Sequence, residues 1–140
     1  MDSYYTLATE FCSWLKELNL INENNATVLL AKLMAIYIAS TELSYPEDIT
    51  DRVTPYKSEK LMLSCDRDLY WEIYDPFVLE EAVCGSVIDD LTDIYNDILQ
   101  GTYLYECGLI DEAAWFWKWN FENHWKYHAT DAMRALCRFE

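Results

Sequence analysis

The chain contains little glycine and little proline, with three residues of each in its 140. So few turn-forming residues are poor material for a fold of many short strands joined by tight turns. The hydrophobic fraction of 52% and the aromatic fraction of 16% are too high for a disordered chain. A chain of this length can bury a hydrophobic core without disulfides or metals. The composition therefore predicts an all-α protein in which residues 1–140 form a single helical domain.

Several signatures of function are also absent. There is no glycine-rich phosphate loop and no G-x-S-x-G sequence. No C-x-x-C pair occurs, so we interpret the cysteines as reduced core residues: Cys12, Cys65, Cys84, Cys107 and Cys137. There is no apolar run of about 18 residues and no basic leader followed by an apolar stretch. We therefore expect a cytoplasmic protein that does not enter a membrane.

Positive charge is scarce, since 10 lysines and arginines face 25 aspartates and glutamates, giving a net charge of −15. Residues 68–117 contain no Lys, Arg or His. Such a chain repels phosphate backbones, so we expect no direct binding to nucleic acid. The charge that neutralises residues 68–117 must come from the last helix, from a bound cation or from a partner with a basic surface.

What the sequence does contain is helical periodicity. Apolar residues at helical spacing predict a bundle of about five helices, over residues 2–18, 26–40, 58–70, 86–108 and 111–139. The second helix is apolar on nearly every side, so we expect it to form the core together with the last helix. Prolines and acidic residues indicate irregular segments at 43–56 and 74–85.

The fourth helix has well-marked ends. Ser86 and Asp89 form an S-x-x-D sequence related to the capping box, and early carboxylates suit the positive end of the helix dipole. Gly108 is predicted to be the left-handed residue that closes this helix. Gly101 could weaken the helix near its end.

Aspartates recur along this helix at one-turn spacing, at Asp89, Asp93 and Asp97, with Asp90 at the flank. One interpretation is a solvated helix face. The other is that cations compensate the aspartates, because like charges one turn apart destabilise a helix by roughly 0.2–0.5 kcal/mol per pair. Only the flanking Asp90 and Asp97 should reach sideways toward a neighbouring helix.

Both histidines lie on the last helix, where His124, His128 and Asp131 follow one another at one-turn spacing. At about 100° per residue these three share a side with Trp117 and the other apolar residues of residues 113–139, and we expect that side to be buried. Each histidine could fill core space and bond a carboxylate, ligate a metal or act as an acid or base. Since Trp125 follows His124, the H-E-x-x-H zinc-protease motif is excluded.

Two functions remain open. The preferred one is a non-enzymatic protein-interaction module whose acidic surface binds a basic protein partner. The alternative is a helical bundle that binds a divalent metal ion and could act as a metal-dependent hydrolase. The sequence identifies no catalytic residue for such an activity. The metal ligands would be drawn from His124, His128, Asp90, Asp93, Asp97 and Asp131.

Three stretches together carry a resemblance: residues 70–76, the Gly85–Asp97 sequence G-S-x-x-D-D-L-x-D-I-Y-x-D, and the H-W-x-x-H-x-x-D-A-x-R-A-L pattern that begins at His124. The chain resembles a bacterial family known only as a domain of unknown function, mainly over its C-terminal half. The resemblance implies a small, cytoplasmic, all-helical protein and brings no activity or catalytic residue with it. It also implies that the Asp-rich and His-rich motifs form one unit.

Overall fold

The computed structural model describes residues 2–47 and 58–139. Its helices are α1 (Asp2–Leu18), α2 (Ala26–Thr41), α3 (Val87–Glu106), α4 (Ile110–Asn120) and α5 (Lys126–Leu136), with a π-helical turn, η1 (Phe121–Trp125), between the last two. Four short strands are present: β1 (Leu20–Ile21), β2 (Ser64–Cys65), β3 (Leu69–Glu72) and β4 (Val83–Ser86). The described chain is therefore mostly helical, as predicted, but also contains two small sheets.

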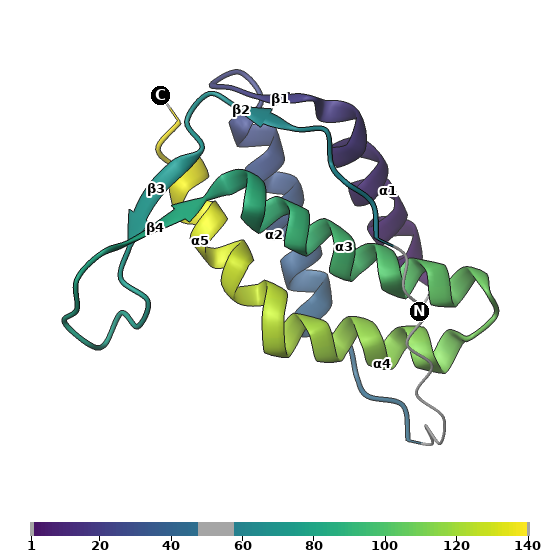
Figure 1. The fold of residues 1–140 in the computed structure, drawn as a ribbon. Coiled ribbons are helices and arrows are strands. Elements are labelled where there is room, and N and C mark those ends of the chain that lie inside the picture. The colour runs from purple at the N-terminus through teal and green to yellow at the C-terminus, as the bar shows by residue number, and fades with distance from the viewer. Residues whose placement is uncertain (1, 48–57, 140) are drawn as a thin grey trace.

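The helices share one hydrophobic core, and α3 is the central helix, with the others packed around it (Figure 1). This helix packs against α1 on one side and against α4 and α5 on the other. Buried apolar residues line its inner face: Val87, Leu91, Ile94, Tyr95, Ile98 and Leu104. The β3–β4 hairpin projects from the same end of the molecule as the last turn of α5 (Figure 1).

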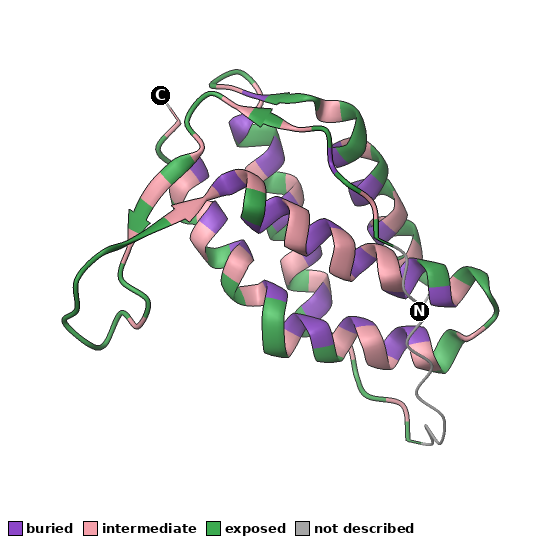
Figure 2. Cartoon of the chain, in the orientation of Figure 1, coloured by how far each residue is buried: buried purple, intermediate pink, exposed green. Residues whose placement is uncertain are grey.

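The prediction that α2 is central is wrong. Its buried residues, among them Leu29, Leu33 and Ile36, occupy one face only. Val28, Met34 and Ile38 are exposed on the other face, as the mixed colouring of α2 indicates (Figure 2). A helix with apolar residues all round can lie at the edge of a small bundle, because composition does not say how many sides are covered.

The prediction of a helix over residues 58–70 is also wrong. If α4, η1 and α5 are counted as one helical run, the described chain has four helices rather than the five predicted. Residues 61–65 are instead extended, and Leu61, Leu63 and Cys65 turn inward while Met62 and Ser64 are exposed. This alternation is the period of a strand. β2 pairs in parallel with β1, and β3 pairs antiparallel with β4. The predicted loop at 43–56 lies mostly outside the described residues.

The ends of α3 are as predicted. The Ser86 hydroxyl accepts a hydrogen bond from the Asp89 amide at 3.1 Å, which is the expected N-cap. Asp68 supports this cap, since its carboxylate accepts from the Ser86 hydroxyl and from the Ile88 amide. At the other end Gly108 has a φ of +83°, a left-handed conformation that favours glycine.

The last helical run contains an irregularity that the sequence analysis missed. In η1 the Lys126 amide donates to the Phe121 carbonyl, five residues earlier, which adds one residue to the helical register. From the last residue of this turn onward the buried positions are Trp125, Ala129, Ala132 and Leu136. They lie one residue later than His124, His128, Asp131 and Ala135, so the prediction that the histidines and Asp131 are buried is wrong. Apolar residues expected on the same side, among them Trp117, are buried. The histidines lie instead at the edge of the core.

The cysteines occupy different environments. Of the cysteines, Cys12 is buried and Cys65 partly buried, whereas Cys84, Cys107 and Cys137 are exposed, so the interpretation of all five as core residues is wrong. All five carry free thiols. Within residues 2–47 and 58–139, no helix is both long and apolar enough to cross a membrane. Cytoplasmic location and single-domain organisation stay predictions.

Candidate metal centre

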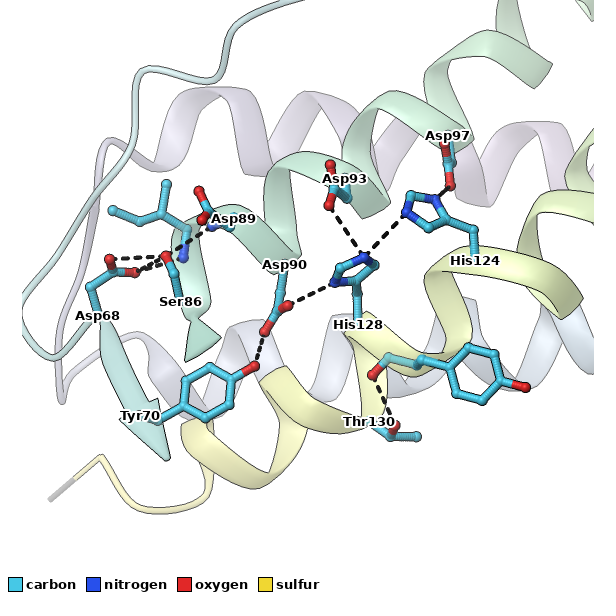
Figure 3. A network of polar contacts seen from close by, with 12 residues as sticks. Asp68, Tyr70, Ser86, Asp89, Asp90, Asp93, Asp97, His124, His128 and Thr130 are labelled. Atoms are coloured by element: carbon cyan, nitrogen blue, oxygen red, sulfur yellow. Dashed lines mark hydrogen bonds and ion pairs between the residues drawn. The ribbon is translucent and has the colours of Figure 1, made fainter. Parts of the chain in front are cut away.

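The Asp-rich face of α3 lies beside the histidines of the last helical run (Figure 3). The turn around Gly108 joins α3 to α4, and the chain then returns alongside α3. Because η1 shifts the register, His124 and His128 point across to α3 rather than into the core. The expected coupling of the two motifs therefore takes the form of direct side-chain contacts.

Each histidine is held by an aspartate at its Nδ1 atom. The Nδ1 of His124 lies 2.5 Å from Oδ2 of Asp97, and the Nδ1 of His128 lies 2.8 Å from Oδ1 of Asp90. An ionised carboxylate only accepts hydrogen bonds, so each Nδ1 carries a proton. This contact fixes the tautomer and orientation of both rings and leaves each Nε2 available.

The two Nε2 atoms converge. They lie 3.2 Å apart, and Oδ2 of Asp93 lies 3.2 Å from the Nε2 of His128 (Figure 3). The ligand atoms of Asp93, His124 and His128 all lie within 4.8 Å of one another. Two neutral imidazoles would present lone pairs to each other at this distance and repel. The arrangement therefore calls for a proton or a cation between the rings.

The aspartates of α3 occupy distinct environments. Asp90 is buried, with 5% of its surface exposed, and Asp97 is largely covered, so the flanking pair does reach sideways as predicted. Asp93 remains nearly half exposed beside His128. Asp89 is exposed at the start of the helix. Because Asp90 and Asp97 bind histidines, the aspartates do not form an unbroken solvated row.

A tyrosine extends the network beyond the helices. The hydroxyl of Tyr70, on β3, donates a hydrogen bond to Oδ2 of Asp90, whose other oxygen faces His128 (Figure 3). Burial raises the pKa of this hydroxyl far above its ordinary value, and the contact with Asp90 raises it further. Tyr70 is thus a permanent donor that holds the Asp90 carboxylate in place.

Contacts and burial within the network shift the pKa values of His128 and Asp97. The hydrogen bond to Asp90 raises the pKa of His128, and burial of the ring opposes this only in part. Burial raises the pKa of the Asp97 carboxyl, although the contact with His124 works in the other direction. His128 therefore binds a proton more readily than an ordinary histidine.

Asp131 lies apart from the convergent Nε2 atoms. Its carboxyl instead contacts that of Glu72 on β3, and burial followed by this contact raises the pKa of Glu72 to about 7. Burial also raises the pKa of Asp131. Of the six predicted ligands, the structure thus brings Asp93, His124 and His128 together, places Asp90 and Asp97 behind the histidines, and pairs Asp131 with Glu72.

Comparison with known families gives a match over residues 2–139 to the model of a domain of unknown function, DUF5063. The chain belongs to this family. The resemblance seen in the sequence is confirmed, and the match reaches well beyond the C-terminal half. No curated protein matches the chain.

A solved structure shares the fold of this DUF5063 member. It is the crystal structure of protein BF1032 from Bacteroides fragilis, which superposes with a TM-score of 0.70 at 21% sequence identity. The alignment covers 97% of this chain and 91% of the other. At this identity the likeness concerns the fold alone.

Two residues of the site in this DUF5063 member were missed by sequence reasoning, Tyr70 and Glu72. Both lie on β3, which overlaps the end of the helix predicted over residues 58–70 and precedes the irregular segment predicted at 74–85. The available signal was their position at the start of the 70–76 stretch that carries the family resemblance.

Proposed function

We propose that this protein binds a divalent transition-metal ion through Nε2 of His124, Nε2 of His128 and the carboxylate of Asp93. The observation that carries the proposal is the convergence of two histidines whose Nδ1 atoms are both held by carboxylates. This carboxylate–histidine pairing is the usual support of a metal-ligating imidazole.

The distances fit such an ion. Two nitrogens bound to one tetrahedral Zn²⁺ at about 2.0–2.1 Å each lie about 3.3 Å apart. The two Nε2 atoms are 3.2 Å apart, and Oδ2 of Asp93 is 3.2 Å from the Nε2 of His128. A set of two histidines and one carboxylate suits zinc or ferrous iron and leaves at least one coordination position for water or another ligand.

The competing account is that a proton takes the place of the metal. A doubly protonated His128 would donate to Asp93 or to His124, and the raised pKa of His128 favours this form. The two accounts differ in their dependence on pH. A metal competes with the proton for the same nitrogen, so metal affinity should fall as the pH decreases from 8 to 6.

The test is a titration of chelator-treated protein with Zn²⁺, Fe²⁺ and Mn²⁺, followed by calorimetry and thermal unfolding. We expect one ion per chain and a rise in stability of about 2.7 kcal/mol when the free metal is 100 times its Kd. Ca²⁺ prefers oxygen ligands and should bind much more weakly than Zn²⁺. His124→Ala, His128→Ala and Asp93→Asn should each weaken zinc binding strongly.

Asp89→Asn is the matched control, because Asp89 carries the same charge on the same helix but is exposed and does not contact the histidines. This variant should bind zinc as the wild type does. If the double variant His124→Ala/His128→Ala binds zinc as tightly as the wild type, the ion binds elsewhere on the acidic surface and the proposal is wrong.

A second candidate function is contact with a basic protein partner, and the tip of the β3–β4 hairpin, residues 73–82, favours it. Phe77 and Leu79 are 96% and 97% exposed, beside acidic Asp75, Glu80 and Glu81. Exposed apolar residues set among charges of one sign are typical of a protein contact surface. The partner that complements this tip has an apolar patch surrounded by Lys and Arg.

The test compares wild type with a Phe77→Ser/Leu79→Ser variant as bait in a pull-down at low and high ionic strength. The proposed partner should bind wild type at low salt, dissociate at high salt and fail to bind the variant. Equal recovery by the two baits would exclude the hairpin tip as the contact.

A further inference from the structure

Residues of β3 and of the last turn of α5 line a cavity. Figure 1 shows these two elements at the end of the molecule where the hairpin projects. The volume of the cavity is about 260 Å³. Three arginines and three aromatic residues contribute to its lining: Arg67, Arg134, Arg138, Tyr70, Trp71 and Phe139. None of the described residues that line it is acidic.

This concentration of positive charge is unusual for the chain. The sequence has a net charge of −15 and four arginines, three of which line this one cavity. Among the described residues, none of the three forms an ion pair. Asp131 lies one turn before Arg134, and Arg134 lowers the pKa of that carboxyl against the larger effect of burial. The cavity is therefore a local site of positive charge on an acidic protein.

Backbone contacts hold two of the guanidinium groups in position. Nη1 of Arg67 donates to the carbonyl of Arg138 at 2.7 Å, and Nη1 of Arg134 donates to the carbonyl of Trp71 at 3.2 Å. Each contact uses one N–H group and leaves the rest of the planar fork for another acceptor. Such forks match the paired oxygens of a carboxylate or phosphate.

We propose that this cavity binds a small organic anion that carries a phosphate or carboxylate group on a flat apolar ring. The guanidinium groups would bind the anionic group, and the aromatic side chains would pack against the ring. The volume lies below the roughly 300–1,000 Å³ of pockets for drug-sized ligands, which limits the ligand to about one ring. This proposal uses none of the three proposed metal ligands, although Tyr70, which lines the cavity, also donates to Asp90 behind His128.

The experiment is a titration of the full chain with phenyl phosphate and with benzoate, monitored by nuclear magnetic resonance of the Trp71 indole N–H and the Arg134 Nε–H. Benzyl alcohol is the uncharged probe and inorganic phosphate the probe without a ring. We expect both signals to shift with at least one of the two ring-bearing anions. Benzyl alcohol should leave the signals unchanged, phosphate alone should bind more weakly, and added salt should weaken binding. Comparison of the two anions identifies which acidic group is preferred.

Variants distinguish binding in this cavity from general electrostatic attraction between the anion and the protein. Arg67→Gln and Arg134→Gln should each weaken binding about tenfold, and Arg134→Lys should weaken it less, since it keeps the charge but loses the fork. Lys16→Gln removes one positive charge from an exposed position on α1 and should bind as the wild type does. The His124→Ala/His128→Ala variant should also retain anion binding, which distinguishes failure of this proposal from failure of the metal proposal.

Three results would overturn the proposal. The first is the absence of any shift with either ring-bearing anion. The second is an equal shift with benzyl alcohol, which would show an apolar contact only. The third is unchanged affinity in both glutamine variants, provided that their circular dichroism spectra show a normal fold.

Discussion

Asp90 is the carboxylate on which the polar network depends most, because it is buried and has partners on both of its oxygens. One oxygen accepts from Tyr70 and the other faces His128. A buried carboxylate that loses a partner carries a desolvation cost that nothing offsets. The stability of the metal-free protein should therefore depend on His128 more than on His124, which is the more exposed of the two rings.

His128→Ala should lower the free energy of unfolding of the metal-free protein by about 1–3 kcal/mol, measured by urea denaturation in the presence of a chelator. His124→Ala should have a smaller effect. Thr130→Ala, an exposed position on the same helix, is the control and should stay within about 0.5 kcal/mol of wild type. Neutral effects of both histidine variants would show that the histidine–aspartate contacts add nothing to the fold.

The raised pKa of Glu72 predicts how the stability of the fold depends on pH. Burial and the neighbouring Asp131 raise its pKa from 4.5 to about 7 in the folded state. A raised pKa gives stability that is fully present below pH 4.5 and is lost as the pH rises through 7. His128, whose pKa is also raised, contributes with the same sign.

The melting temperature of the metal-free protein should consequently be higher at pH 5.5 than at pH 8. Glu72→Gln should reduce this difference by raising the melting temperature at pH 8. A melting temperature that increases from pH 5.5 to 8 in wild type would contradict the assigned environments of Glu72 and His128.

Sequence reasoning at the residue scale found the histidines and aspartates and included histidine–carboxylate contacts, but it did not identify which histidine meets which aspartate. One-turn spacing on two neighbouring helices was enough to predict that Asp90 and Asp97 reach sideways. Which nitrogen meets which carboxylate depends on the helical register, and that register is changed by η1. Tyr70 and the arginine-lined cavity were missed because residues 58–70 were assigned to a helix. Glu72 lies just beyond that predicted helix, where no strand was expected.

At the scale of secondary structure, the close contact between α3 and α4 depends on Gly101. A Cβ built at this position would lie 2.1 Å from Nε1 of Trp117. The indole is fully buried, and its N–H donates to the carbonyl of Ile98 at 3.0 Å. Gly101 does not end α3, which continues to Glu106, and its role is to make room for this indole.

Gly101→Ala should therefore destabilise the protein, although alanine is the better helix former. Displacing a packed indole costs about 1–3 kcal/mol, against a helical gain of about 0.5–1 kcal/mol. Chemical denaturation with tryptophan fluorescence as the signal measures the difference. Gln100→Ala, at the preceding position, should be nearly neutral, and a Gly101→Ala variant as stable as wild type would argue against this packing.

Secondary structure was predictable where the local pattern agreed with the fold. The Ser86 cap and the left-handed Gly108 follow from short-range chemistry, and both were found. The strands were not, because β2 has two residues and its pairing with β1 joins Leu20 to Ser64, a contact between distant parts of the chain. The π turn was missed because the apolar pattern was interpreted at a constant 100° per residue.

At the scale of the whole molecule, charge is distributed unevenly. The aspartates of α3 meet the two histidines, the hairpin tip is acidic and exposed, and the three arginines of the described residues line the cavity at the end of α5. A net charge of −15 gives a self-repulsion that a bound divalent cation would reduce. The metal centre would thus stabilise the fold by direct ligation and by lowering this repulsion.

Anomalous diffraction from a crystal grown with Zn²⁺ tests the metal centre most directly, because it locates the ion. The account predicts one strong zinc peak at about 2.0–2.2 Å from Nε2 of His124, Nε2 of His128 and a carboxylate oxygen of Asp93. The Nδ1 contacts with Asp97 and Asp90 should be retained. Zinc peaks only at other carboxylates, with the two Nε2 atoms still in direct contact, would contradict it.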